Sequence, residues 1–156
     1  MGILKFNRFK KIDGVHLSAL KIINLEDGDV LHGMKKNDFG FNGFGEAYFS
    51  EIKFKKIKAW KRHRSMTLNL IVPSGKVRFV IYDDRANSDT YEAFQEVVLS
   101  KNNYFRLTIP PMLWVGFQGL NEKNNFLLNI ANIEHQPNES DRLEIDEINY
   151  DWEQKK

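Results

Sequence analysis

Short runs of alternating apolar and polar residues, separated by turn signals, constrain the fold of this chain more than any other feature. The clearest run covers residues 65–72 (SMTLNLIV). One face of this run carries Met66, Leu68, Leu70 and Val72, and the other carries Ser65, Thr67 and Asn69. A period of two is typical of a β-strand with one buried face, so the segment is predicted to be a strand.

Similar runs recur along the chain. Strands are predicted at residues 20–25, 47–56, 76–83, 96–100, 105–109 and 126–133. Turn-forming residues separate them, as in the Pro73-Ser74-Gly75 turn, and a helical turn or two is expected near residues 140–147. A chain of 156 residues with many short strands predicts one all-β domain, built as a sandwich, jelly roll or barrel.

Charge is nearly balanced in total but unevenly distributed. The 23 Lys and Arg residues against 21 Asp and Glu residues give a net charge of +2. Residues 53–64 (KFKKIKAWKRHR) are strongly basic, whereas residues 134–153 are acidic. The basic stretch has three interpretations: a solvated strand face, a site for a phosphate-bearing small molecule, or a nucleic-acid surface. The isoelectric point of 8.7 is below the usual range of nucleic-acid-binding domains, and the acidic segment would repel a polyanion, so no nucleic-acid partner is expected.

Standard metal and cofactor motifs are missing from the sequence. There is no cysteine, which excludes disulfides, catalytic thiols and thiolate metal sites. The four histidines are scattered, and the glycine-rich stretch GFNGFG at residues 40–45 has neither phosphate-loop nor dinucleotide-binding spacing. We therefore expect no metal and no cofactor. No run reaches the ~20 apolar residues of a membrane span, and the first residues lack the apolar core of a signal peptide, so we expect no membrane partner and a cytoplasmic location.

Three segments carry a resemblance to a known family. They are IKAWKRH at residues 57–63, IVPSGKVRFVIYDDRANSDTY at residues 71–91 and LTIPPMLWVGFQGL at residues 107–120. In order and spacing they resemble the core of the dTDP-4-dehydrorhamnose 3,5-epimerases, a family related to the dTDP-sugar 3,4-ketoisomerases. The resemblance implies the cupin jelly-roll fold and a homodimer. The resemblance covers roughly residues 46–152. We expect a single cupin domain over residues 1–156, with N-terminal strands and the glycine-rich loop at 1–45 and an acidic C-terminal extension at 134–156.

The resemblance also shows what is missing. In the family a histidine, supported by an aspartate, removes protons beside a ketone, and a tyrosine protonates the opposite face. Matched segment by segment, the histidine falls on Lys61, the aspartate on Phe79 and the tyrosine on Leu128. An ordinary lysine is protonated at neutral pH, and neither Phe79 nor Leu128 can transfer a proton. The family mechanism is therefore not carried over to these positions.

A displaced site remains possible in the same pocket. If Lys61 points into the barrel, a period of two directs His63, Ser65, Thr67 and Asn69 the same way. His63, which coincides with the second histidine of the ketoisomerase branch, is then the candidate base. Tyr48 or Glu46 is the candidate acid. The expected substrate-binding residues are Lys58, Lys61, Ser50, Thr67 and Asn69, with the two lysines on phosphate or keto oxygen. The alternative is a structural imidazole in a polar barrel interior.

These observations predict a cofactor-independent epimerase or keto-isomerase. Its substrate would be a nucleoside-diphosphate 4-keto-deoxysugar used in surface polysaccharide biosynthesis. The alternative is a catalytically inactive sugar-nucleotide-binding or scaffold subunit that kept the cupin pocket. If residues 61–69 line the pocket, the apolar face of residues 66–72 points outward, and a second subunit is expected to cover it.

Overall fold

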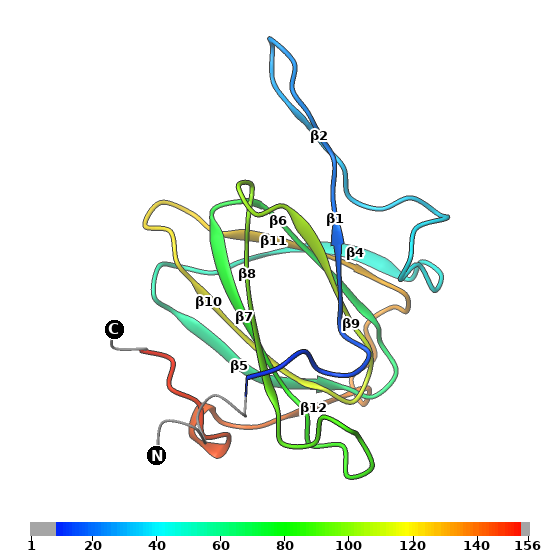
Figure 1. Cartoon of the computed structure of the whole chain (residues 1–156), viewed down its shortest axis with the longest axis vertical. Coiled ribbons are helices and arrows are strands. Elements are labelled where there is room, and N and C mark those ends of the chain that lie inside the picture. The colour runs from blue at the N-terminus through cyan, green and yellow to red at the C-terminus, as the bar shows by residue number, and fades with distance from the viewer. Residues whose placement is uncertain (1–8, 154–156) are drawn as a thin grey trace.

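Two antiparallel five-stranded sheets make up most of the computed structural model, which describes residues 9–153 (Figure 1). One sheet has the order β1-β9-β6-β11-β4, formed by His16–Ala19, Phe105–Ile109, Leu68–Ser74, Phe126–Ala131 and Glu46–Glu51. The other has the order β12-β5-β10-β7-β8, formed by Ser140–Arg142, Ile57–His63, Trp114–Gly119, Lys76–Tyr82 and Phe94–Ser100. This arrangement confirms the predicted all-β jelly-roll architecture.

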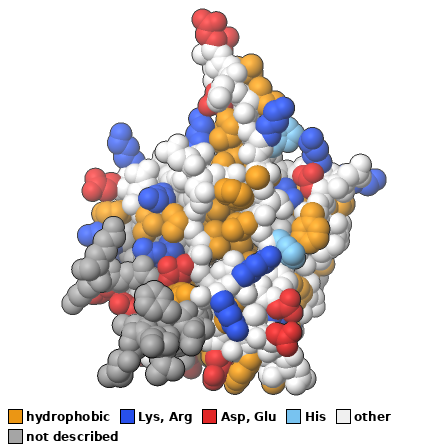
Figure 2. All heavy atoms as spheres, viewed as in Figure 1, with side chains coloured by type: hydrophobic (Ala, Val, Ile, Leu, Met, Phe, Trp, Pro, Cys, Tyr) orange, Lys and Arg blue, Asp and Glu red, His pale blue; other side chains and the backbone are white. Residues whose placement is uncertain are grey.

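A small hairpin extends from the sandwich. Strands β2 (Ile22–Ile23) and β3 (Val30–Leu31) pair with each other, and their hairpin projects away from the two sheets (Figure 1). Acidic side chains lie at its tip, and hydrophobic side chains run along its flank and over the face below it (Figure 2). The predicted strand at residues 20–25 therefore exists, although it is only two residues long.

The main core lies between the two sheets and follows from strand alternation. In β7, Val77, Phe79 and Ile81 are fully buried in this core. A second apolar cluster covers the opposite face of the β5–β10–β7 sheet, where the C-terminal segment packs. It consists of Trp60, Val80, Phe94, Trp114, Ile148 and Trp152. The acidic C-terminal segment is thus anchored by aromatic packing and forms part of the domain.

The strand predicted at residues 65–72 begins later than expected, and its apolar face points into the core instead of outward. Strand β6 begins at Leu68, after a turn that carries the chain from the sheet of β5 to the sheet of β6. The alternation therefore does not continue from β5 into β6. Met66 and Val72 belong to the core, as do Leu68 and Leu70, and none of the four is more than 7% exposed. The prediction of an outward apolar stripe is wrong.

The polar residues of β6 face the other way, toward the N-terminal segment. Asn69 donates from Nδ2 to the carbonyl oxygen of Gly40 and accepts from the Thr108 hydroxyl. Gly40 has a φ of +88°, and a Cβ there would lie 2.9 Å from Thr108 Oγ1. Arg106, which is 1% exposed, donates to the carbonyl oxygens of Gly33 and Phe39. The glycine-rich stretch is therefore a structural loop held against this sheet.

Other element boundaries differ from the prediction in smaller ways. Strand β9 matches it at both ends. Strand β5 was considered only as a strand face of the basic run at residues 53–64, without bounds, and β10 was not predicted. In place of helical turns at 140–147, residues 140–142 join β5 as β12, and Ile145–Glu147 form one 3-10 turn. No helix in the described part of the chain is long and apolar enough to cross a membrane. The signal-peptide expectation concerns residues 1–8, which lie outside the described range.

Candidate active site

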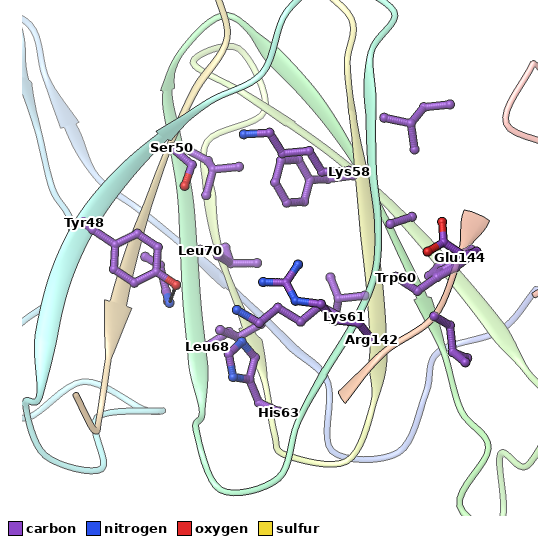
Figure 3. Close-up of a pocket in the computed structure, with 17 residues that line it drawn as sticks. Tyr48, Ser50, Lys58, Trp60, Lys61, His63, Leu68, Leu70, Arg142 and Glu144 are labelled. Carbon is purple, nitrogen blue, oxygen red and sulfur yellow. Dashed lines mark hydrogen bonds between the residues drawn. The ribbon is translucent and has the colours of Figure 1, made fainter. Parts of the chain in front are cut away.

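A cavity of about 600 Å³ opens between the two sheets (Figure 3). Its apolar wall consists of Leu68, Leu70, Val115, Phe117 and Leu127. Polar side chains enter from β4, from β5, from β11 and from the segment that follows β12. A cavity of this size with an apolar wall and a few converging polar groups is the usual form of a small-molecule site.

His63 and Glu139 form a buried pair at one end of this cavity. His63 is the last residue of β5, and its Nδ1 lies 2.6 Å from Oε2 of Glu139. The other carboxylate oxygen of Glu139 accepts the backbone N–H groups of Ser65 and Met66 at 3.1 and 2.8 Å. Glu139 is therefore fixed by the turn after β5, and it orients the imidazole. Within the described residues Nε2 of His63 has no hydrogen-bond partner, which leaves it available to a ligand in the cavity.

The environment favours the neutral form of His63. Burial lowers the pKa of His63 below its ordinary value of 6.5, although the hydrogen bond and charge of Glu139 act in the opposite direction. Burial alone would raise the pKa of Glu139, but the contact with His63 and the two backbone N–H groups lower it overall. At neutral pH the pair is thus an imidazole held by a carboxylate. This is the arrangement of a general base and its orienting group.

Two cations enter the cavity from neighbouring strands. Lys61 of β5 and Arg142 of β12 are directly paired in the sheet, and Figure 3 shows both side chains extending into the cavity. Neither side chain makes a hydrogen bond or an ion pair with the residues that the structure describes. Burial, followed by the charge of Arg142, lowers the pKa of Lys61, while Glu139 and Glu46 act to raise it.

Strands β4 and β11 supply the opposite wall. The hydroxyl of Tyr48 accepts a hydrogen bond of 3.0 Å from Nδ2 of Asn129, whose Oδ1 accepts the backbone N–H of Asn69. Ser50 lies two residues further along β4 and also lines the cavity. Lys58 lines it as well, and its Nζ donates to the carbonyl oxygen of Glu51 at 2.8 Å. A phenol and an ammonium group therefore also face the cavity, from Tyr48 and Lys58 (Figure 3).

Five of the eight predicted site residues line this cavity. They are His63, Tyr48, Lys58, Lys61 and Ser50. Glu46 does not line it, although its charge acts on Lys61. The prediction that Thr67 and Asn69 line the cavity is wrong. The chain crosses from one sheet to the other before β6, and this turns their side chains to the other face. Thr67 donates its backbone N–H to Asn132 Oδ1, outside the cavity.

Four polar lining or supporting residues were missed by the sequence reasoning. They are Glu139, Asn129, Arg142 and Glu144. Glu139, Arg142 and Glu144 lie in the acidic segment at residues 134–153. The composition of this segment indicated only that it would repel polyanions. The signal for Asn129 was present, because it alternates with Leu127 in β11 and both face the cavity.

The positions matched to the family's aspartate and tyrosine both lie outside the cavity. Phe79 is fully buried and packs behind Phe117, with ring centroids 5.9 Å apart. Leu128 points to the opposite face of β11 from Leu127 and Asn129. The polar residue that β11 supplies to the pocket is thus Asn129, one position beyond the matched leucine. No group of three His, Cys, Asp or Glu residues within residues 9–153 is arranged to hold a metal ion.

Comparison with known proteins agrees with this fold. The family model described as dTDP-4-dehydrorhamnose 3,5-epimerase matches residues 59–156. The crystal structure of a dTDP sugar isomerase from Desulfovibrio desulfuricans G20 superposes with a TM-score of 0.89 at 37% identity, covering 93% of this chain and 94% of that one. The epimerase of Legionella pneumophila Philadelphia 1, solved in complex with dTDP-4-keto-L-rhamnose, shares the fold at a TM-score of 0.77 and 20% identity, covering 87% of this chain and 76% of that one.

A curated relative matches over a shorter stretch. The probable low-salt glycan biosynthesis epimerase Agl13 of Haloferax volcanii is 29% identical over 84 residues, which cover 53% of this chain. Those residues cover 54% of the relative, so the chain spans about half the length of the curated relative it matches.

Proposed function

Because the chain belongs to the dTDP-4-dehydrorhamnose 3,5-epimerase family, we propose that it epimerises or keto-isomerises a nucleoside-diphosphate 4-keto-deoxysugar. The observation that carries this proposal is the His63–Glu139 pair at the end of an apolar cavity. A base placed beside a ketone removes the neighbouring C–H proton and produces an enediolate. Return of a proton to the other face of the carbon gives an epimer, and return to the second carbon of the enediol moves the keto group. Neither outcome changes the oxidation state of the sugar as a whole.

His63 acts as the base in this proposal. It is neutral at neutral pH, its Nδ1 is held by Glu139, and its Nε2 is left for the substrate. The carboxylate stabilises the imidazolium that forms when the proton is taken, as in other histidine–carboxylate pairs. The family's histidine matches the position of Lys61. The proposed base thus lies two residues beyond that position, on the same face of β5.

Tyr48 and the cavity cations complete the proposed site. Tyr48 is the candidate acid because its phenol faces the cavity from the opposite wall and accepts, so its own proton is free to be donated. Lys58 and Arg142 are candidate contacts for the diphosphate or for the oxygen that becomes negative. The Legionella epimerase, which was solved with dTDP-4-keto-L-rhamnose, supports the choice of a dTDP-linked sugar. The Haloferax relative supports a role in the synthesis of surface polysaccharides, and a cytoplasmic location remains part of the proposal.

Deuterium exchange tests the proposal directly. The protein is incubated in D₂O with dTDP-4-keto-6-deoxyglucose, and mass spectrometry locates the deuterium in the sugar. Incorporation at C3 and C5 indicates a 3,5-epimerase, and incorporation at C3 alone indicates a 3-epimerase. A 3-keto product with deuterium at C4 indicates a 3,4-ketoisomerase. His63→Asn should lower exchange by about 10²–10⁴-fold, the usual contribution of general-base catalysis. His32→Asn, far from the cavity in the projecting hairpin region, is the matched control and should leave exchange unchanged.

The alternative is a binding or scaffold subunit without catalysis, which the loss of the family's acid–base residues at positions 79 and 128 favours. The same experiment separates the two functions. Binding of dTDP-, UDP- or GDP-4-keto sugars with no deuterium exchange in any of them would replace the epimerase by the binding subunit.

A further inference from the structure

Lys61 belongs to the basic run at residues 53–64 and lines the cavity, and within residues 9–153 its ammonium group makes neither a hydrogen bond nor an ion pair. Its neighbours Arg62 and Arg64 both form ion pairs with Asp141, and Arg62 also pairs with Asp84. Lys61 instead faces Arg142 directly across the β5–β12 ladder, and neither cation has an acidic partner within residues 9–153. Like charges directly opposite each other destabilise a sheet. Pairing within the sheet therefore does not account for Lys61, and its side chain extends into the cavity (Figure 3).

The surroundings of this amine make it easier to deprotonate than the amine of an ordinary lysine. Lys61 is partly buried against a cavity wall of aliphatic and aromatic side chains, and burial is the main cause that lowers its pKa. Arg142 lowers the pKa further, whereas the more distant carboxylates Glu139 and Glu46 raise it. Desolvation together with a neighbouring cation is the known way in which a lysine amine becomes a nucleophile toward carbonyl groups.

We propose that Lys61 forms a Schiff base with the keto group of the sugar, and that His63 removes the neighbouring proton from this iminium. The inference rests on the proposed function and deepens it. Because period two places residues i and i+2 on the same side of a strand, both groups enter the cavity from one face of β5. Their charges interact, since Lys61 acts to lower the pKa of His63 (Figure 3).

The steps balance without any further reagent. The neutral amine of Lys61 attacks C4 of the sugar. The carbonyl oxygen leaves as water with one proton from the amine and one from solvent, and the C4=N bond that forms keeps the second amine proton, so the nitrogen is positively charged. The C3–H bond then breaks. Its electron pair forms a C3=C4 double bond and neutralises the nitrogen, while the proton moves to Nε2 of His63. A proton returns to C3, water adds to C4, and the release of the ketone regenerates the amine.

Reductive trapping tests the covalent step apart from the activity. The protein is mixed with dTDP-4-keto-6-deoxyglucose and sodium cyanoborohydride, digested, and analysed by mass spectrometry. The sugar nucleotide should be found attached to the peptide that contains Lys61. Lys61→Arg keeps the charge but cannot form the imine, so it should abolish the adduct and lower deuterium exchange by at least 10²-fold. Lys56→Arg, at an exposed lysine outside the cavity, is the matched control and should keep both.

Chemical rescue and the pattern of results complete the test. Ethylamine added to Lys61→Ala should restore part of the exchange, because a free amine can supply the missing nucleophile. Exchange without an adduct, or exchange retained by Lys61→Arg, would overturn the Schiff base and leave the proposed epimerase intact. An adduct on Lys61 without exchange in any 4-keto sugar would support the Schiff base and overturn the epimerase.

Discussion

Glu139 acts on chemistry through His63, and this makes it a positioning residue. Its carboxylate holds Nδ1 of His63 and the backbone N–H groups of Ser65 and Met66. Glu139→Gln should lower deuterium exchange by about 10²-fold or more, because the amide favours the wrong tautomer of the imidazole and stabilises its protonated form less. The readout is the initial rate of exchange, and Glu134→Gln at an exposed neighbouring position is the control.

The pH profile of deuterium exchange shows whether Glu139 raises or lowers the pKa of His63. The base must be neutral, and the pKa of His63 is lowered, so protonation of His63 should reduce exchange in the unsubstituted protein only below pH 6.5. Glu139 acts to raise that pKa, so Glu139→Gln should move the acid limb to still lower pH. An acid limb that moves to higher pH in the variant would contradict the assignment of His63 as the base.

Tyr48 supports a second prediction at this scale. If its phenol returns the proton from the wall opposite His63, Tyr48→Phe should lower formation of the epimer more than it lowers deuterium exchange. The imidazole can still return a deuteron to the face it came from. The ratio of product to exchanged substrate measures this, and Tyr91→Phe, half exposed in a remote turn, should leave the ratio unchanged. Equal loss of both rates would remove Tyr48 from the proton pathway.

Whether such residues can be predicted from sequence depends on how far apart along the chain the contacting residues lie. Lys61 and His63 share a face of one strand, so alternation sufficed to place both in the cavity. Glu139 lies 76 positions from His63, and nothing in its own neighbourhood indicates that it pairs with a histidine. The prediction that Asn69 lines the cavity was wrong for a different reason. It extended the alternation of β5 into β6, although the two strands lie in different sheets and the local pattern does not indicate the crossing.

At the scale of elements, a polar network closes the turn between β7 and β8. Asp83 is fully buried at the end of β7, and its carboxylate accepts hydrogen bonds from Arg85, Ser88 and Thr90. Burial alone would raise the pKa of Asp83, but these hydrogen bonds together hold it well below its ordinary range. The resemblance identified this run of residues before the structure did, and the network gives a physical reason for the pattern of residue types.

Breaking that network should cost stability in a pH-dependent way. Asp83→Asn should lower the free energy of unfolding at neutral pH by about 2–4 kcal/mol, because it leaves the buried donors poorly matched. The depressed pKa means that this contribution is fully present above the ordinary value of 3.8 and is lost as pH falls below it. Urea unfolding across this range measures the difference, with exposed Asp89→Asn as the control. A neutral-pH loss below 1 kcal/mol would show that the network is dispensable.

Whole-molecule connectivity explains why the site could not be assembled from its strands alone. The C-terminal segment adds β12 to β5 and supplies Glu139, Arg142 and Glu144 to the site. Its anchor is Trp152, whose ring packs 5.3 Å from that of Trp60 and fits against Gly116, where a Cβ would lie 2.8 Å from the indole. One sheet strand and one pocket wall thus depend on a segment whose acidic composition alone suggested no such role.

Assembly is the remaining property at this scale, and the surface that favours it differs from the expected one. The residues of β6 once expected to face a second subunit are buried. Strand β4, however, is an edge strand, which among residues 9–153 pairs only with β11, and its central Phe49 is 66% exposed. Phe44, just before this strand, is 65% exposed. An open strand edge flanked by exposed aromatic rings is a surface that soluble monomers usually protect.

We therefore expect a homodimer in which a second copy covers the edge of β4. Light scattering at micromolar concentration should give a particle of about twice 18.3 kDa. Phe49→Lys should shift the mass toward the monomer, because it places a charge at the centre of the covered edge, whereas Tyr91→Lys, at a half-exposed tyrosine in the turn before β8, should not. Since Tyr48 and Ser50 line the cavity from the same strand, dissociation should also weaken sugar-nucleotide binding. An unsubstituted protein that scatters as a single 18.3 kDa chain would contradict the dimer.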